Sequence, residues 1–153
     1  MSYESQIYNK AIADGMPRPL ALLIVAQAKH ETNNFQSSIF QDCKNAFCYK
    51  VFGNARPCPG HTDYEAYNNV IDSTHEITAW IKRRLNEGNF PPLLTVTDPV
   101  QYATILKNNG YYGDSLNNYA AGLENWYKDN INGSMSAGIL IAAIVAILII
   151  RRA

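Results

Sequence analysis

The chain has 153 residues, with 13 basic and 13 acidic side chains and a formal net charge of zero at pH 7. This length is enough for one domain with a substantial core, and the balanced charge creates no net field towards nucleic acid or acidic lipid. We therefore expect no nucleic-acid partner. The ten tyrosines and two tryptophans could stack on sugar rings, although packing in the core would explain most of them equally well.

Two helices are expected at the start of the chain. Residues 2–14 read as a short helix, and the Asp14–Pro19 segment, which contains a glycine and two prolines, breaks it. From Leu20 onwards, apolar residues recur at the i, i+3, i+4 period of a helix that should be buried on most sides. This second helix should end near Asn33, because asparagine favours helix ends. Its last turn carries Glu31.

The region that follows is expected to be mostly loop. Residues 36–62 are rich in proline, glycine, cysteine and asparagine, so we expect at most a small pair of strands there. An odd number of cysteines leaves one unpaired in a single chain, and Cys48 could form a disulfide with either Cys43 or Cys58. With His61 the spacing is C-x4-C-x9-C-x2-H, which fits no regular zinc motif. We therefore predict no metal site and no cofactor.

Three further helices are predicted in the second half. Residues 72–86 form a helix with Trp80 on its inner face and the basic cluster 82–84 on its solvent side. The next helix covers residues 98–108, with the aspartate at its start as the N-cap and the following proline in its first turn. The last helix of the domain covers residues 115–129.

The end of the chain reads as a membrane anchor. Residues 134–150 carry no charge and consist mostly of Ile, Ala, Val and Leu. They would make roughly 26 Å of helix, at the short end of the span of about 20 residues that crosses a bilayer core. The following Arg151–Arg152 pair suits a cationic end anchor. The predicted division is a domain at residues 1–130 and a single-pass anchor at residues 131–153 in contact with the lipid bilayer.

This anchor determines the predicted location. The C-terminal arginines favour a cytoplasmic C-terminus, with the folded domain outside. No cleavable signal peptide is predicted, because Met1–Glu4 lacks a basic start and no apolar core follows before Ala21. We therefore predict a membrane-anchored protein, either in the internal membrane of a phage virion, with other virion proteins as further partners, or in the bacterial envelope.

Glu31 is the candidate with the clearest chemistry. It lies near a helix C-terminus, where the negative end of the macrodipole disfavours a carboxylate, and apolar surroundings would disfavour it further. Both effects raise its pKa, as a general acid at neutral pH requires. Glycoside hydrolysis uses such an acid to protonate the leaving oxygen, and usually adds a second carboxylate. A single glutamate at a helix end is more often a surface residue, so the surrounding pattern carries the prediction.

Four segments form that pattern, and together they cover most of residues 10–128. They are Leu23–Thr32, which ends in His-Glu-Thr; Asn45–Lys50, with the sequence Asn-Ala-Phe-Cys-Tyr-Lys; Tyr64–Asn68 with Asp72–Ser73; and Gly110–Asp114 with Tyr119. In this order they resemble glycoside hydrolase family 73, the bacterial and phage N-acetylglucosaminidases of the lysozyme-like superfamily. The second segment resembles the family's Asn-x-Phe-Gly-x-Lys, with Cys48 in place of the glycine. The fourth is similar to Gly-Tyr-Ala-Thr-Asp-Pro-x-Tyr.

The resemblance implies a mainly α fold, a lysozyme-like α+β domain with a reduced β-lobe, to which the membrane helix is added. It implies Glu31 as the general acid and Tyr111 as a second catalytic residue that positions the substrate or polarises the reacting centre. For Tyr111 a packed turn residue is an equal alternative. The residues implied to bind substrate are Asn45, Phe47, Tyr67 and Tyr112, of which Phe47 could equally be a core residue.

The second carboxylate is the open point. Many family members carry it between the positions of Lys50 and Tyr64, and the acids nearest to this short segment are Asp63 and Glu65. If neither faces Glu31, the substrate's own 2-acetamido group could take its place. The sequence predicts a peptidoglycan hydrolase that cleaves the glycan strand next to N-acetylglucosamine. The alternatives are a lytic transglycosylase and a non-catalytic, membrane-anchored wall-binding or structural virion protein.

Overall fold

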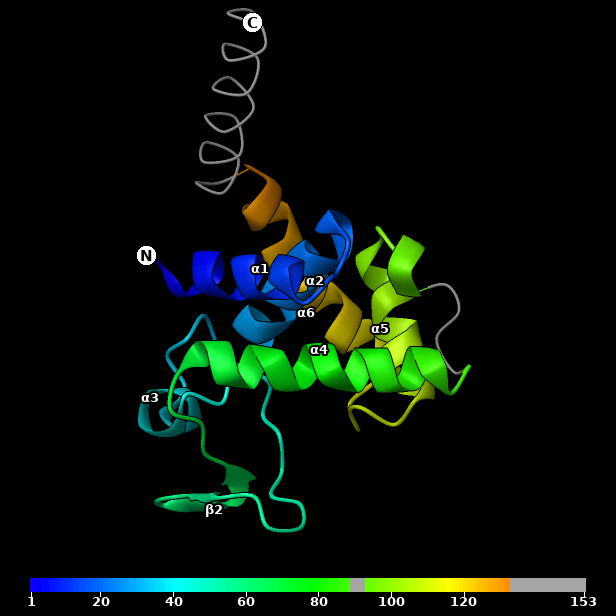
Figure 1. Ribbon diagram of the computed structural model, residues 1–153. Helices are drawn as coiled ribbons and strands as arrows, with labels where there is room; N and C mark the ends of the chain where they lie inside the picture. Colours follow the sequence, from blue (N-terminus) through cyan, green and yellow to red (C-terminus); the bar gives the residue numbers. More distant parts are fainter. Residues whose placement is uncertain (89–92, 133–153) are drawn as a thin grey trace, which may run out of the picture.

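The computed structural model describes residues 1–88 and 93–132, which form a mainly helical fold with a small two-stranded sheet (Figure 1). In chain order the elements are α1 (Tyr3–Ala13), α2 (Arg18–Glu31), α3 (Ser38–Cys43), β1 (Pro57–Cys58), β2 (His61–Glu65), α4 (Val70–Asn86), the 3₁₀ helix η1 (Leu93–Thr95), α5 (Pro99–Asn108) and α6 (Leu116–Asn132).

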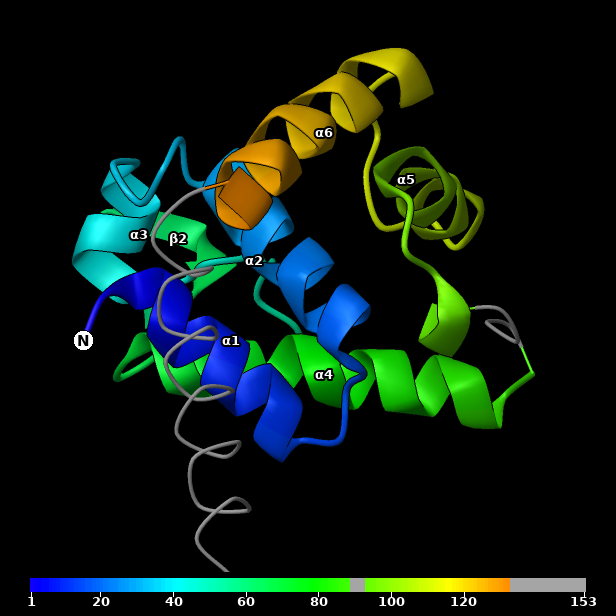
Figure 2. The same cartoon turned by 90° about the horizontal axis from the view of Figure 1, so that it is seen from above.

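Helix α2 forms the centre of the core. All residues from Leu23 to Ala28 are buried, so this helix is apolar on nearly every side, as its sequence predicts. It packs against α1 and α6, while α4 packs against α1 and α5 against α6 (Figure 2). Burial of this many apolar side chains is the main source of stability in such a fold.

The helix ends follow local chemistry, and here the sequence predictions are confirmed. The side chain of Asp98 accepts a hydrogen bond from the backbone of Gln101, and Pro99 occupies the first turn of α5. At α4 the cap is Asn69, whose side chain accepts from the backbone of Asp72, so this helix begins two residues earlier than predicted.

The segment between α2 and α4 contains more structure than its composition indicates. The short helix α3 was not predicted, whereas β1 and β2 form the expected antiparallel pair of strands. A disulfide joins Cys43 of α3 to Cys58 of β1, with a Cα–Cα distance of 5.6 Å. Cys48 is a free thiol. Both pairings of Cys48 that the sequence left open are therefore wrong.

The predicted membrane anchor requires a correction. In the described ranges 1–88 and 93–132, no helix is long and apolar enough to cross a membrane. The longest helices there, α4 and α6, carry several charged side chains each. The fold class with a transmembrane helix and the membrane-anchored location, in a virion or in the envelope, are therefore wrong as predicted. Residues 134–150 themselves lie outside the described residues.

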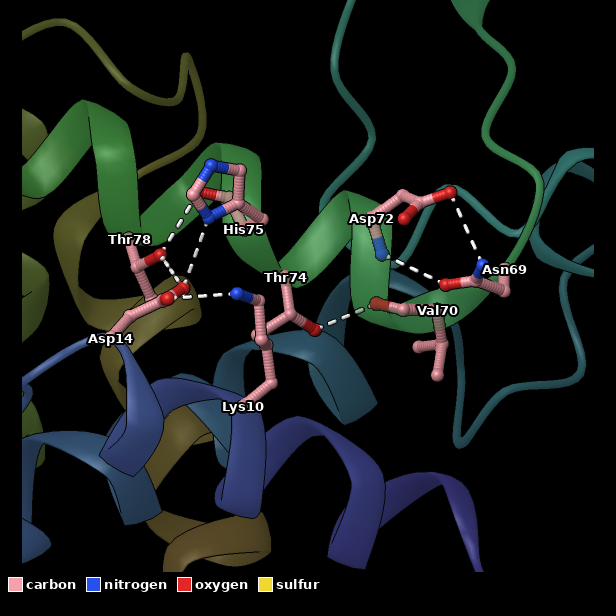
Figure 3. A network of polar contacts seen from close by, with 8 residues as sticks. All are labelled: Lys10, Asp14, Asn69, Val70, Asp72, Thr74, His75 and Thr78. Atoms are coloured by element: carbon pink, nitrogen blue, oxygen red, sulfur yellow. Dashed lines mark hydrogen bonds and ion pairs between the residues drawn. The ribbon is translucent and has the colours of Figure 1, made fainter.

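A polar cluster joins the end of α1 to α4 (Figure 3). The carboxylate of Asp14 accepts hydrogen bonds from Lys10 at 2.8 Å and from Thr78 at 2.6 Å, and Nδ1 of His75 lies 3.2 Å from it. Burial by itself would raise the pKa of Asp14, but its contacts with Lys10, Thr78 and His75 outweigh burial and hold the pKa below its ordinary value. The ionised form of Asp14 therefore stabilises the packing of α1 on α4.

Replacing Asp14 by asparagine tests this contribution. The folded-state pKa lies below the unfolded value, so the stabilisation is complete above the ordinary value of 3.8 and is lost as the pH falls through the folded pKa. We expect Asp14→Asn to lower the free energy of unfolding by about 1–3 kcal/mol at neutral pH, and by less in acid. Urea unfolding at several pH values measures this. The control Asp42→Asn, at an exposed pair with His61, should change stability by less than about 0.5 kcal/mol. A loss that is independent of pH would contradict the ionic role.

Candidate active site

A strained turn fixes Glu31 at the end of α2. Residues 33–35 all have left-handed backbones, with φ values of 47°, 58° and 65°, which is rare for residues other than glycine. The buried Thr32 holds the turn, because its hydroxyl donates to the carbonyl of Ala28 at 2.6 Å and accepts from the amide of Phe35 at 2.8 Å. Backbone strain of this kind persists only where the surroundings impose it, and it clusters at functional sites.

Tyr119 of α6 contacts the side chain of Glu31. Its hydroxyl donates to Oε1 of Glu31 at 2.6 Å. The tyrosine ring stacks on Tyr112 with 3.7 Å between ring centroids and meets the ring of His30 edge-on at 4.8 Å. Tyr119 is only 3% exposed. These two ring contacts hold its hydroxyl in place against the carboxyl group.

The environment of Glu31 favours its protonated form. Burial raises the pKa of this carboxyl, and the hydrogen bond from Tyr119 together with the nearby thiol of Cys48 offsets only part of that increase. The sequence predicts two causes for a raised pKa of Glu31, the helix macrodipole and apolar surroundings, and burial is the second of them. Glu31 therefore keeps its proton at higher pH than an ordinary glutamate does.

A pocket of about 300 Å³ is lined in part by Cys48, whose thiol contacts the backbone of Glu31. It is lined by Phe47, Cys48, Tyr49, Lys50, Trp80, Arg84, Asn109, Gly110 and Tyr111. Glu31 is not among these residues, but Cys48 connects the two, since its thiol donates to the backbone carbonyl of Glu31 at 3.4 Å. The volume is at the lower end of the range of about 300–1,000 Å³ that is typical of ligand pockets.

Tyr111 and Trp80 form an aromatic wall of this pocket, with their rings edge-on at 5.4 Å. The hydroxyl of Tyr111 points inward and donates to the carbonyl of Phe47 at 2.8 Å. Burial raises the pKa of Tyr111 well above its ordinary value. The hydroxyl of Tyr111 therefore holds the loop at Phe47, as the alternative of a packed turn residue would have it, while the residue also lines the pocket.

Cys48 has a left-handed backbone, with a φ of 51°, the conformation that glycine adopts most readily. Burial, together with the charge of Glu31, raises the pKa of its thiol to about 12. The side chain is therefore a neutral thiol that supports the main chain at Glu31.

Two of the predicted sugar-binding residues are interior residues instead. Asn45 is fully buried, and its amide donates to the carbonyls of Tyr49 and Glu65, both at 2.9 Å. It holds the loop onto β2 and has no free group for a ligand. Phe47 is 2% exposed, so its side chain belongs to the core while its residue borders the pocket. For Asn45 this is a correction, and for Phe47 it favours the core alternative.

The other two predicted sugar-binding residues, Tyr67 and Tyr112, lie outside the pocket lining. The hydroxyl of Tyr67 donates to the carboxylate of Glu65 at 3.0 Å, and that of Tyr112 donates to the carbonyl of Ala103 at 3.0 Å. Tyr112 therefore acts on the site through its stacking on Tyr119, which in turn contacts Glu31.

Neither predicted second carboxylate is brought to Glu31. Asp63 is exposed on β2, and its carbonyl accepts from the amide of Val51. Glu65 contacts Tyr67. A different acid, Asp114, lies close enough to His30 and Tyr112 for its charge to act on both rings.

Sequence reasoning missed several residues of the site. Tyr119 stood in the fourth segment of the pattern but received no role, and Arg84 was placed on the solvent side although it lines the pocket. Gln27, one turn before Glu31, is fully buried and accepts from Tyr102 at 2.7 Å, while its Nε2 lacks a hydrogen-bond partner among the described residues. A helical spacing of four residues could have indicated Gln27, because i and i+4 share one face.

The site therefore combines an acid from α2, a tyrosine from α6 and a pocket between α4 and the loops around it. Within residues 1–88 and 93–132, no group of three or more side chains could hold a metal ion. The resemblance to family 73 rests on the sequence segments alone. Comparisons with protein-family models, with curated proteins and with solved structures found no match.

Proposed function

We propose that this protein is a glycoside hydrolase that cleaves the glycan strand of peptidoglycan next to N-acetylglucosamine, with Glu31 as the general acid. The observation that carries the proposal is the Glu31–Tyr119 pair, a half-buried carboxyl of raised pKa held 2.6 Å from a fixed hydroxyl. The aromatic pocket beside it gives a sugar chain a place to bind.

In this mechanism the protonated carboxyl of Glu31 donates its proton to the glycosidic oxygen as the bond between that oxygen and the anomeric carbon breaks. Glu31 is then a half-buried carboxylate, and the hydrogen bond from Tyr119 stabilises this charged form. Since neither Asp63 nor Glu65 contacts Glu31 in the described residues, the substrate's 2-acetamido group attacks the anomeric carbon, and water, which gives its proton to the Glu31 carboxylate, then opens the resulting ring.

The same observation favours a second candidate, a lytic transglycosylase. That reaction also needs one glutamate, and the 6-hydroxyl of the muramic acid unit replaces water as the nucleophile. Both reactions start with proton donation by Glu31, and they differ in the sugar end that they leave.

Digestion of purified peptidoglycan with the full chain, followed by borohydride reduction and mass spectrometry, tests the proposal. We expect new reducible N-acetylglucosamine ends. Anhydro-muramic ends would instead assign the transglycosylase reaction. A digest without new ends of either kind would overturn the enzymatic proposal and leave a wall-binding protein.

Replacing Tyr119 by phenylalanine should shift the pH dependence of cleavage. The hydrogen bond from Tyr119 lowers the pKa of Glu31, so its loss raises that pKa further. Because the acid must be protonated, the rate of the variant should persist to higher pH than that of the wild type. Initial rates between pH 4 and 9 measure the shift. The control Tyr112→Phe loses a hydroxyl that donates to the carbonyl of Ala103. Its rate should fall at the same pH as that of the wild type. If the rate of Tyr119→Phe fell at a lower pH than that of the wild type, Glu31 would not be the acid that Tyr119 contacts.

A further inference from the structure

We propose that the pocket beside Glu31 is a subsite for a sugar unit that carries a carboxylate, with Trp80 as the aromatic contact and Arg84 and Lys50 as the cationic partners. This inference rests on the proposed function, because it names the kind of sugar that the same site takes. It assigns substrate selectivity to α4, a helix that contributes nothing to the Glu31–Tyr119 pair.

The pocket lining carries positive charge and no negative charge. Two of its nine lining residues, Lys50 and Arg84, are cationic, and none is acidic, although the chain has 13 acidic residues. Nη1 of Arg84 lies 3.1 Å from Glu87, which is outside the lining. A guanidinium has five N–H donors, so this pair leaves donors for a ligand. Lys50 is exposed, with its ammonium 3.6 Å from the ring centroid of Tyr64 and with Asp63 nearby.

Trp80 and Arg84 are arranged to act on one ligand. They lie one turn apart on α4, with the guanidinium carbon of Arg84 5.7 Å from the ring centroid of Trp80. The edge-on contact with Tyr111 at 5.4 Å helps to fix the indole. A sugar ring in contact with Trp80 therefore carries its substituents within reach of Arg84. The planar fork of arginine matches a carboxylate, whereas an uncharged sugar offers it no anion.

The position of the pocket fits an alternating glycan. Peptidoglycan alternates N-acetylglucosamine with N-acetylmuramic acid, and only the second bears a lactyl group, whose carboxylate is free or joined to a stem peptide. If Glu31 acts next to N-acetylglucosamine, the neighbouring unit is the acidic one. The pocket adjoins Glu31 through Cys48 without including it, which is where that neighbouring unit would lie.

Binding to an inactive full-length chain tests the subsite. Isothermal titration of Glu31→Gln would use three tetrasaccharides: chitotetraose, the alternating glucosamine–muramic acid tetrasaccharide without stem peptides, and the same tetrasaccharide with them. We expect an acidic tetrasaccharide to bind about tenfold more tightly than chitotetraose at low salt. A preference without peptides identifies the lactyl carboxylate, and a preference only with peptides identifies the stem carboxylates. Either result supports the subsite.

Variants of α4 decide which residue provides the preference. Adding Arg84→Gln should lower the affinity for the acidic tetrasaccharides to that for chitotetraose. The matched control Arg83→Gln, an exposed neighbour paired with Glu76 outside the pocket, should retain it. Equal affinity for all three tetrasaccharides, or equal effects of the two arginine variants, would overturn the subsite. The assay measures binding without turnover, so this failure is distinct from a failure of peptidoglycan digestion by the wild type.

Discussion

Replacing Glu31 by glutamine is expected to lower the rate of glycan cleavage by about 10²- to 10⁴-fold, the usual contribution of a general acid. Glutamine has nearly the same shape and still accepts the hydrogen bond from Tyr119, but it has no proton to donate to the leaving oxygen. The rate of release of soluble fragments from purified peptidoglycan measures the loss.

The same variant should be at least as stable as the wild type. The folded-state pKa of Glu31 is raised, so the protonated carboxyl stabilises the fold fully below the ordinary value of 4.5, and this contribution is lost as the pH rises through the folded pKa. Neutral glutamine does not undergo this loss. The stability of Glu31→Gln relative to the wild type should therefore increase with pH, as thermal unfolding at pH 4 and pH 8 would measure.

A matched control separates the loss of the acid from a general effect of losing a carboxylate. Glu124→Gln removes a carboxylate on α6 that pairs with Lys128 at 3.5 Å and does not line the pocket. It should cleave at the rate of the wild type. Full activity of Glu31→Gln, or an equal loss in both variants, would rule out Glu31 as the general acid.

Replacing Gly122 by alanine is expected to destabilise the fold by about 1–3 kcal/mol, the usual cost of overpacking a core. A methyl group at this position of α6 would lie 2.3 Å from Cε1 and Nδ1 of His30 on α2. His30 has little room to move, because its ring packs edge-on against Tyr119 at 4.8 Å. The higher helix propensity of alanine, about 1 kcal/mol, offsets only part of the cost. Chemical denaturation measures the change.

Two further variants test the cause. In a His30→Ala background the ring is absent, so Gly122→Ala should cost less there, and a double-mutant cycle gives the coupling. Gly113 has no neighbouring atom within 4 Å of an added methyl group, so Gly113→Ala should change stability by less than about 0.5 kcal/mol. Equal effects at the two glycines would contradict the predicted contact.

The helices could be predicted because their signals are local. Asp98 and Pro99 start α5 through a cap and a fixed φ, and the apolar period of α2 marks a buried helix without knowledge of its neighbours. Helix α3 has six residues and no such period. It depends on distant packing, since the ring of Phe40 meets Tyr3 of α1 at 4.9 Å and Phe35 at 5.2 Å. The sequence around α3 does not indicate these ring contacts, so the helix could not be predicted from it.

In the candidate site, too, local features could be predicted and contacts between distant residues could not. Glu31 could be singled out because a helix end and its apolar neighbours are visible in the sequence. Its partner Tyr119 lies 88 residues further along the chain, and only the packing of α6 on α2 brings the two together. The pairing of Cys43 with Cys58 was equally inaccessible, because connectivity cannot be deduced from spacing. Asn45 illustrates the reverse error, since its place in the Asn-Ala-Phe-Cys-Tyr-Lys segment predicts a ligand contact, whereas its amide holds a loop.

The protonation of Glu31 can be measured directly by a carbon-detected NMR titration of the side-chain carboxyl groups, with the Glu31→Gln variant to assign the signal. We expect the Glu31 signal to titrate above the ordinary glutamate value of 4.5, because burial outweighs the hydrogen bond from Tyr119. The midpoint should rise further in Tyr119→Phe. A midpoint at or below 4.5 in the wild type would contradict the account, because the pKa of Glu31 would then not be raised above that of an ordinary glutamate.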